Sequence, residues 1–410
     1  MLMLPMVRKR AHVLCVAQGL IALLIGWGVV CPASTPAQPA IKAALPPEQR
    51  PLAQVAPYRR LLWVSRWDYR KPEDVERIFY RAAQARFSDV MFQVRGEGTA
   101  FYKSSLEPWA WELSGRGIAG AGTDPGWDPL AKALMEGHRY GLKVHAYLNV
   151  MPGWAQREVA PAASGQLFSI HRSWFMMDVD GERMDPRRLK EGPTYAYLDP
   201  ALPRVREHLA AVAREVAARY PVDGIHLDYI RYPCEHGEYS FNPEVVQRFR
   251  DLYGGSPRRR PRDWAKFRRD QVTEVVRAIS RAVRQARPGV ELSAAIIADP
   301  EKRRNDACQD AERWLKEGLL DAVAPMAYTG EMERFDEFCK VYRGEPWDGK
   351  VWLGIWADSG RNGQLLGEVR RAVKVGFPGV AVFSYNELFP AHSLPRRAIN
   401  LYRIFIGESS

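Results

Sequence analysis

The chain has 410 residues, of which 46% are hydrophobic, so it can bury a large core as one barrel-sized domain or as several smaller ones. Its formal net charge of +11 favours an anionic polymer or an envelope surface as a partner. The densest basic run, Arg258–Arg260, is expected to be a solvated loop. No zinc-finger, phosphate-loop or dinucleotide fingerprint occurs, so nucleic acid, a metal and a cofactor are not expected.

The first 33 residues have the pattern of an export signal. Arg8–Arg10 is a basic start, residues 11–31 are mostly apolar, and Pro32–Ser34 supplies small residues suited to cleavage. The alternatives are an uncleaved membrane anchor, because the apolar run is nearly long enough to span a bilayer, and lipidation at Cys31. Residues 34–57, rich in Pro, Ala and Gln, predict a disordered tether, which leaves residues 58–410 as the folded domain.

From residue 60 onward, short β-type segments alternate with longer helical segments in eight pairs. The predicted strands are Leu61–Arg66, Asp89–Arg95, Lys143–Val150, Gly224–Tyr229, Glu291–Ile297, Ala322–Tyr328, Val351–Trp356 and Gly379–Tyr385. The predicted helices cover residues 73–86, 127–140, 203–220, 243–252, 264–287, 307–317, 331–342, 361–376 and 394–404.

Eight alternating units predict an α/β fold, a single closed (β/α)8 TIM barrel. The alternative is an open doubly wound sheet, which normally carries a glycine-rich first turn; here the first turn is Trp67–Lys71. The loops that leave the strands are long, notably 96–126, 151–202 and 230–263. Such loops gather on one face of a barrel and are expected to build a cleft there.

The strongest functional signal lies in residues 222–233. Ile225 and Leu227 share one face of the predicted strand, while His226 and Asp228 share the other, because side chains alternate along a strand. An inward carboxylate at the carboxyl end of a strand is where TIM barrels place their chemistry. Asp228 is therefore the first catalytic candidate; the structural alternative is that it caps the next helix or pairs with Arg231.

Two other predicted strands carry polar side chains with the same alternation. The polar set that is expected to face the barrel axis is Gln93, Arg95, Glu97, His145, Tyr147 and Asn149. Buried polar groups are costly unless paired, so an inward cluster implies mutual hydrogen bonds, water or a ligand. Hydrogen bonding is favoured over metal binding for His145 and His226, because no clustered His or Cys spacing supports a metal.

Acids and aromatic residues recur where the predicted strands end. They are Asp68, Glu97, Asp228, Asp299, Asp358 and Glu387, with Trp67, Tyr147, Tyr328, Trp356 and Tyr385. Aromatic faces stack on sugar rings, and two carboxylates across a sugar-sized gap are what glycoside cleavage requires. The structural alternative for the Trp residues is core packing. A Ser-His-Asp hydrolase is disfavoured, because no Gly-X-Ser-X-Gly motif occurs.

Several of these segments also resemble a known family. They are Leu62–Ser65, Phe92–Arg95, Ala100–Tyr102, Gly126–Leu130, Gly141–Asn149, Tyr197–Pro200, Asp223–Pro233 and Phe383–Tyr385. In this order the chain resembles the bacterial glycosyl-hydrolase-like 10 family over about residues 58–390. The family often carries Arg-Pro-X-Gly after its second strand, where this chain has Arg95–Gly98.

The resemblance implies an exported barrel that acts on a glycan, and its relatives are linked to envelope polysaccharides including peptidoglycan. By family position it carries over Asp228 as the catalytic acidic residue. In the leading hypothesis Asp228 is the nucleophile or base, and Glu97 or Glu387 is the proton donor. The residues expected to bind substrate are Trp67, Asp68, Arg95, Tyr147, Asn149, His226, Arg231, Tyr328, Trp356 and Tyr385.

The leading hypothesis is an exported glycoside hydrolase, periplasmic, envelope-associated or secreted, that acts as a monomer on a polysaccharide. The second hypothesis is a non-catalytic glycan-binding barrel of the envelope, which keeps the aromatic residues but needs no proton donor. A metal-dependent deacetylase or nuclease is a third hypothesis, which a chelator would test.

Overall fold

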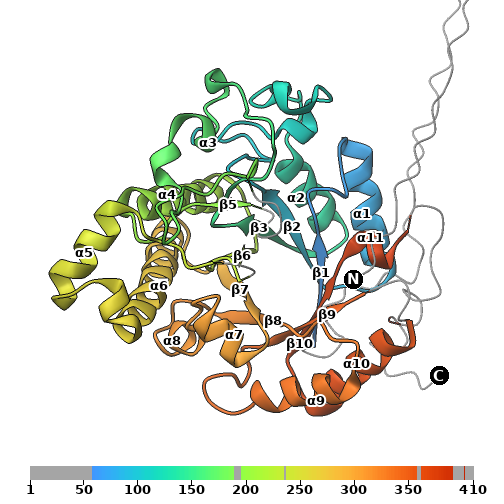
Figure 1. Ribbon diagram of the computed structural model, residues 1–410. Coiled ribbons are helices and arrows are strands. Elements are labelled where there is room, and N and C mark those ends of the chain that lie inside the picture. The colour runs from blue at the N-terminus through green and yellow to red at the C-terminus, as the bar shows by residue number, and fades with distance from the viewer. Residues whose placement is uncertain (1–57, 189–194, 235–236, 358–361, 391–400, 402–410) are drawn as a thin grey trace, which may run out of the picture. The chain divides into compact units, whose positions relative to one another are not determined.

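Eight parallel strands close into a barrel in the computed structural model, which describes residues 58–188, 195–234, 237–357, 362–390 and 401 (Figure 1). The barrel strands are β1 (Arg59–Val64), β2 (Asp89–Arg95), β3 (Lys143–Asn149), β6 (Gly224–Asp228), β7 (Glu291–Ile297), β8 (Ala322–Met326), β9 (Trp352–Trp356) and β10 (Gly379–Phe383). They are neighbours in this order, and β10 pairs with β1. The predicted (β/α)8 TIM barrel is confirmed.

Helices surround the barrel and connect its strands (Figure 1). They are α1 (Pro72–Gln84), α2 (Pro129–Arg139), α3 (Leu167–Ile170), α4 (Pro203–Arg219), α5 (Pro243–Tyr253), α6 (Pro261–Ala286), α7 (Pro300–Asn305), α8 (Ala311–Lys316), α9 (Met332–Val341), α10 (Asn362–Val375) and α11 (Tyr385–Leu388). Many begin with proline, which suits the first helical position because the N–H it lacks would have no partner there.

The structure departs from the predicted elements in one helix, at several strand ends and in one exit loop. The predicted helix 307–317 is shortened to α8, and an unpredicted helix, α7, precedes it across a loop in which Cys308 has a φ of 56°. Strands β8 and β10 end before Tyr328 and Tyr385. The exit loop after β3 contains a two-stranded antiparallel sheet of β4 (Pro152–Trp154) and β5 (Ala196–Tyr197).

The predicted leader 1–33, the predicted tether 34–57 and the predicted last helix, except residue 401, lie outside the described residues. Among the described residues, no helix combines the length and the apolar character that a membrane crossing requires. Cys234, Cys308 and Cys339 form no disulfide in this part of the chain.

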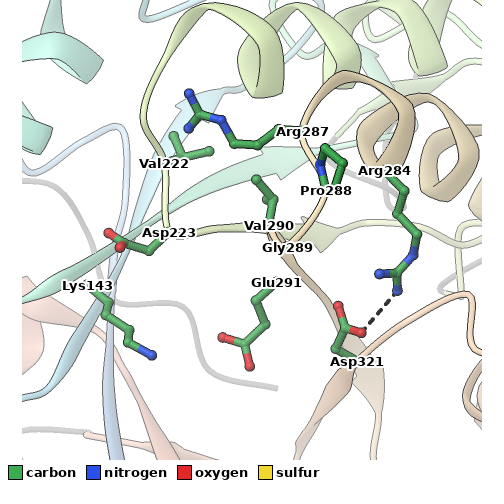
Figure 2. A pocket seen from close by; sticks show the side chains of 10 residues that line it. All are labelled: Lys143, Val222, Asp223, Arg284, Arg287, Pro288, Gly289, Val290, Glu291 and Asp321. Atoms are coloured by element: carbon green, nitrogen blue, oxygen red, sulfur yellow. Dashed lines mark hydrogen bonds and ion pairs between the residues drawn. The ribbon is translucent and has the colours of Figure 1, made fainter.

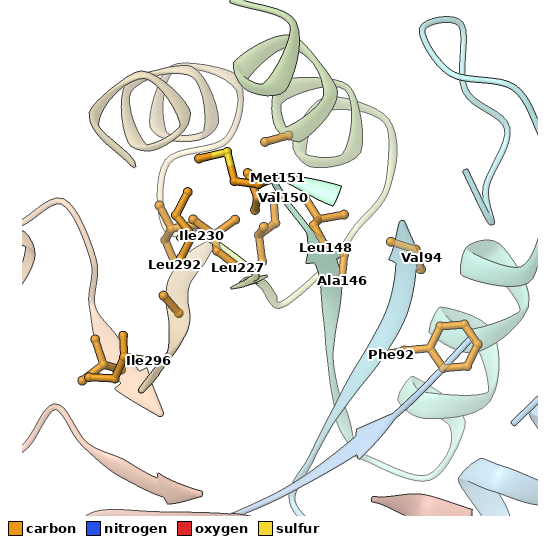
Figure 3. Packing of buried hydrophobic residues seen from close by; sticks show 14 of the residues in the cluster. Phe92, Val94, Ala146, Leu148, Val150, Met151, Leu227, Ile230, Leu292 and Ile296 are labelled. Carbon is orange, nitrogen blue, oxygen red and sulfur yellow. The ribbon is translucent and has the colours of Figure 1, made fainter. Parts of the chain in front are cut away.

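Alternation along the strands divides the core into two layers. The outward layer packs between the sheet and the helices and includes Phe92, Val94, Ala146, Leu148 and Leu227 (Figure 3). The inward layer fills the barrel axis with Leu61, Trp63, Met91, Tyr147, Ala295, Ala322, Ala324, Trp352 and Ala381. The predicted outward direction of the apolar residues in β2, β3 and β6 is therefore confirmed.

An ionic cluster closes the amino-terminal end of the barrel axis. Asp89 accepts a hydrogen bond from Arg59 Nε at 3.0 Å and lies 3.1 Å from His145 Nε2. Arg59 also donates to Glu291 at 3.0 Å. His145 has room because Gly224 carries no side chain: a Cβ atom there would lie 2.1 Å from His145 Nδ1.

We expect Gly224→Ala to lower the free energy of unfolding by about 1–3 kcal/mol, because His145 is fixed by ionic partners and cannot yield. Urea titration measures the change. The matched control is Gly363→Ala, in open space on the exposed side of α10, where alanine should be neutral or slightly stabilising. Equal stability of the two variants would contradict this account.

Candidate functional site

Asp228 ends β6 on the inner face of the barrel and is 7% exposed. Its carboxylate accepts hydrogen bonds from the Tyr147 hydroxyl at 2.8 Å and from the backbone N–H of Tyr229 at 2.6 Å. Arg231 Nη1 lies 3.4 Å from Oδ1, the oxygen that accepts from the Tyr229 N–H, while Tyr147 donates to Oδ2. Asp228 does not cap α5, which follows Asn242. The carboxylate is therefore oriented by three donors from two adjacent strand ends.

Burial, and then the neighbouring Asp228 carboxylate, hold the pKa of Tyr147 well above its usual value. Tyr147 therefore stays protonated and acts as the donor. Burial lowers the pKa of His226 to about 3, and the second histidine, His145, adds to the fall. His226 is consequently neutral at physiological pH, with its Nδ1 2.9 Å from the Ser293 hydroxyl.

Three buried polar atoms around Asp228 lack a hydrogen-bond partner among the described residues. They are Asn149 Oδ1, His226 Nε2 and Arg231 Nε. Asn149 is the register partner of Asp228 on β3, and His226 lies two residues before it on the same face of β6. Buried polar atoms are normally satisfied, so unsatisfied donors and acceptors beside a carboxylate favour a polar ligand or water at this place.

Tyr328 belongs to the same group of residues. Burial raises its pKa far above the usual value, and the Asp228 carboxylate adds to that rise. Its ring also packs 5.8 Å from the ring of Phe383 at the end of β10. Trp356, at the end of β9, is 38% exposed. Of the predicted site residues, the structure therefore brings together Tyr147, Asn149, His226, Asp228, Arg231 and Tyr328.

A second acidic cluster lies at the exits of β1 and β2. Arg66 lies 3.5 Å from Glu97 and 3.2 Å from Glu112, and all three side chains are essentially inaccessible to solvent. Glu97 also accepts hydrogen bonds from the Trp111 indole at 2.8 Å and from Gln156 at 3.2 Å. Glu97, predicted as a proton donor, is thus fully enclosed and holds Trp111 in place.

Gly96 makes room for this cluster. A Cβ atom at Gly96 would lie 1.9 Å from Arg66 Nη1, so any side chain there would displace the guanidinium. Burial raises the pKa of Glu112 to about 7, with Glu97 adding to the rise and Arg66 opposing it. Burial also raises the pKa of Tyr195, whose ring lies 5.8 Å from the Arg66 guanidinium carbon and 5.3 Å from the Tyr229 ring.

Asp68 follows β1, and Tyr385 and Glu387 follow the neighbouring strand β10. Asp68 accepts from the backbone N–H of Ser65 at 2.6 Å, and burial raises its pKa to about 6, with Glu387 nearby adding to the rise. Tyr385 begins α11, and its hydroxyl lies 3.5 Å from Arg81 on α1. The structure brings Asp68 and Glu387 near each other but directs Tyr385 toward α1.

Arg95 does not face the barrel axis, which corrects the predicted direction. The pairing of β2 with β3 shifts register between Gln93 and Arg95, and Arg95 pairs with the buried Glu107 at 2.6 Å. It also donates to the carbonyl of Val150 at 3.0 Å. Arg95 therefore supports the loop after β3 through hydrogen bonds to its backbone.

Two other acids that were predicted at strand ends remain to be placed, Asp299 and Asp358. Asp299 caps α7 by accepting from the backbone N–H groups of Glu301 and Lys302, and Asp358 lies outside the described residues. In the part of the chain that is described, no three His, Cys, Asp or Glu side chains group so as to hold a metal ion.

Sequence reasoning missed Arg66, Trp111, Glu112, Tyr195 and Tyr229 as members of the site. All five lie after strand ends or in long exit loops, where no periodicity indicates direction. The one available signal was the Trp-rich segment Trp109–Trp111 inside the long loop 96–126.

A hollow of about 550 Å³ lies at the opposite end of the barrel from Asp228 (Figure 2). It is lined by residues at the amino-terminal ends of β3, β6, β7 and β8, including Lys143, Asp223, Glu291 and Asp321. Its basic and acidic groups are interspersed, and Arg284 pairs with Asp321 at 3.0 Å. Barrel enzymes use the carboxyl ends of the strands, so this hollow is not the candidate site.

Comparison with known proteins finds a matching family model and several relatives. Residues 60–350 match the family model described as Glycosyl hydrolase-like 10. Glycosyl hydrolase DigH of Escherichia coli is 29% identical over 295 residues, 65% of this chain and 61% of that protein. Glycosyl hydrolase YngK of Bacillus subtilis is 26% identical over 255 residues, 58% of this chain and 45% of that protein. The chain therefore spans less than two thirds of either relative.

Solved structures share the fold. The PgaB (BpsB) glycoside hydrolase domain from Bordetella bronchiseptica superimposes with a TM-score of 0.62 at 14% identity, over 85% of this chain and 99% of that one. Alpha-L-fucosidase isoenzyme 2 from Paenibacillus thiaminolyticus gives a TM-score of 0.60 at 14% identity, over 86% of this chain and 49% of that one. At such identities the likeness shows the barrel fold alone.

The raised pKa of Glu112 predicts a pH-dependent stability. Glu112 keeps its proton in the folded protein up to its pKa of about 7, while the unfolded chain releases it near the usual pKa of 4.5. The stability that Glu112 contributes therefore falls as pH rises between these values. Glu112→Gln should therefore gain stability relative to wild type between about pH 5 and pH 8, by up to about 3 kcal/mol.

Denaturant titrations of both proteins at the two pH values measure this difference. The control is Glu207→Gln, which replaces an exposed glutamate of α4. A Glu112→Gln difference that is as flat as the control would show that Glu112 is ionised in the folded protein throughout.

Proposed function

Because the chain belongs to the glycosyl hydrolase-like 10 family, we propose that it hydrolyses O-glycosidic bonds of an envelope or extracellular polysaccharide, with Asp228 as the principal carboxylate. Family membership and the glycosidase names of its relatives support a barrel of the glycoside hydrolase type. The observation that carries the proposal is the orientation of Asp228 by Tyr147, Tyr229 and Arg231 at the carboxyl end of β6.

In the proposed reaction, Asp228 attacks the anomeric carbon or activates water, and a second, protonated carboxyl group donates to the leaving oxygen. Glu97 and Glu387 are the proposed donors, and they differ in surroundings. Glu97 is enclosed, so it must release Trp111 and Gln156 before it can reach a glycosidic oxygen. Glu387 is only half-buried. The separation from Asp228 in the substrate complex then decides between retention and inversion.

The residues around Asp228 are proposed to bind the sugar at the cleaved bond. They are Tyr147, Asn149, His226, Arg231 and Tyr328. Asn149 Oδ1 and Arg231 Nε support this proposal, because they are buried without partners among the described residues and gain hydrogen bonds if sugar hydroxyls reach them. Contacts with more distant sugar units are proposed for Trp67, Asp68, Trp356 and Tyr385. Arg95 instead supports the loop after β3.

We further propose that residues 1–33 direct export, that residues 34–57 form a tether and that the barrel works as a monomer. The basic start and the apolar run of the leader support export. Export would bring the barrel to its substrate, and the glycan strands of peptidoglycan are the first polysaccharide to test. A leader that is retained would keep the barrel at the membrane.

A non-catalytic glycan-binding barrel is the second candidate. The enclosure of Glu97 and Glu112 favours it, because neither side chain is open to a substrate in this conformation. Incubating the protein with peptidoglycan glycan strands and a panel of polysaccharides separates the two candidates. New reducing ends support hydrolysis, while retention without new ends supports binding alone.

We expect Asp228→Asn to abolish the release of reducing ends while leaving the unfolding midpoint nearly unchanged, because the amide keeps the shape but neither attacks nor accepts a proton. The matched control is Asp251→Asn, an exposed aspartate of α5 that accepts from Gln247, which should keep full activity. Wild-type turnover by the Asp228→Asn protein would remove Asp228 from the mechanism.

Tyr147→Phe should lower kcat by roughly 10- to 100-fold, because a hydrogen bond to a charged group contributes about 1.5–3 kcal/mol. The substitution removes the 2.8 Å bond to Asp228 and retains the ring. Steady-state kinetics on the polysaccharide identified by the panel measure it. An unchanged kcat with a raised KM would instead assign Tyr147 to substrate binding alone.

A further inference from the structure

A series of aromatic side chains leads away from the candidate carboxylate toward the exits of β1 and β2. The ring of Tyr229 lies 5.3 Å from that of Tyr195. The guanidinium carbon of Arg66 is 5.8 Å from the Tyr195 ring and 4.6 Å from the Trp67 ring. The rings of Trp67 and Trp111 are 6.3 Å apart. We call Tyr229, Tyr195, Trp67 and Trp111, with Arg66 among them, the aromatic track.

Trp67 is the exposed ring of the track, Tyr229 and Trp111 are half-buried, and Tyr195 is buried. Trp67 is 51% exposed, while Arg66, which contacts its ring, is 1% exposed. The indole N–H of Trp111 donates to the enclosed Glu97, which sets the angle of that ring. Rigid aromatic faces bind a ligand with little loss of side-chain entropy. An exposed indole that is held by buried charges is thus suited to stacking.

We propose that the aromatic track binds successive sugar rings of one glycan chain, so that the protein selects long chains over small glycosides. This inference rests on the proposed function and adds the substrate class. The track begins at Tyr229, whose N–H bonds the candidate carboxylate. Arg66 and Tyr195 lie between Trp67 and that point. The sugar that stacks on Trp67 is therefore a different unit of the chain from the sugar bound at Asp228.

The chemistry of the track fits a sugar chain better than an apolar partner. Each aromatic face stands beside a hydrogen-bonding or charged group: Arg231 lies 4.2 Å over Tyr229, and Arg70 lies 5.4 Å from Trp67. Sugar rings present an apolar face with hydroxyl groups at its edge, which matches this combination. A purely apolar partner would leave the guanidinium groups desolvated without compensation.

The test measures binding separately from cleavage. In the Asp228→Asn background, affinity is measured by calorimetry for oligosaccharides of increasing length from chitin, cellulose and peptidoglycan glycan strands. We expect affinity to rise with chain length, and Trp67→Ala to remove this rise by roughly five- to tenfold while leaving the shortest ligands unaffected. Trp67→Phe, which retains an aromatic face, should restore most of the affinity.

The matched control is Tyr80→Ala, an aromatic residue of α1 that is 46% exposed and contacts Tyr140 outside the track. Equal affinities of the Trp67→Ala and Tyr80→Ala proteins, or no binding of any of these glycans, would overturn the proposal. The hydrolase proposal fails independently, if the wild-type protein releases no reducing ends. Length-dependent binding through Trp67 would then still identify the track.

Discussion

Closure of the sheet is the constraint on which the other features of this structure depend. Pairing of β1 with β10 leaves the barrel without an edge, so every second side chain of each strand must enter an enclosed interior. Trp63, Met91 and Tyr147 fill its middle, and the cluster of Arg59 and Asp89 closes its amino-terminal end. Asn149 Oδ1, His226 Nε2 and Arg231 Nε, which lack partners among the described residues, lie toward the carboxyl end, near Asp228.

Register places the polar groups at that end. Asn149 and Asp228 are partners on adjacent strands, and Tyr147 stands one inward position lower on β3, within hydrogen-bonding distance of the carboxylate. His226 lies beneath them as a neutral ring. The site is therefore built on strands rather than loops, which keeps its geometry rigid, while the exit loops contribute the aromatic groups that surround it.

The direction of a side chain could be predicted from the sequence only where the residue lies within a regular strand. Strand alternation predicted the inward direction of His226 and Asp228, and the bounds of β2 and β7 were predicted correctly. The same rule failed at Arg95, because a register shift in β2 turns that side chain outward. It also failed at Tyr385, because β10 ends two residues earlier and a helix begins. Directions of Trp111 and Tyr195 depend on tertiary contacts of long loops, which periodicity does not encode.

Gly96 has a consequence for how related sequences can vary. Its missing side chain is the space in which the Arg66 guanidinium lies between two enclosed carboxylates. A homologue with a bulkier residue at this position, such as the proline that the family often carries, must hold its arginine elsewhere or lack it. Positions 66 and 96 should therefore covary. This pair of residues would divide the family into subgroups whose side chains beside the β6 carboxylate differ.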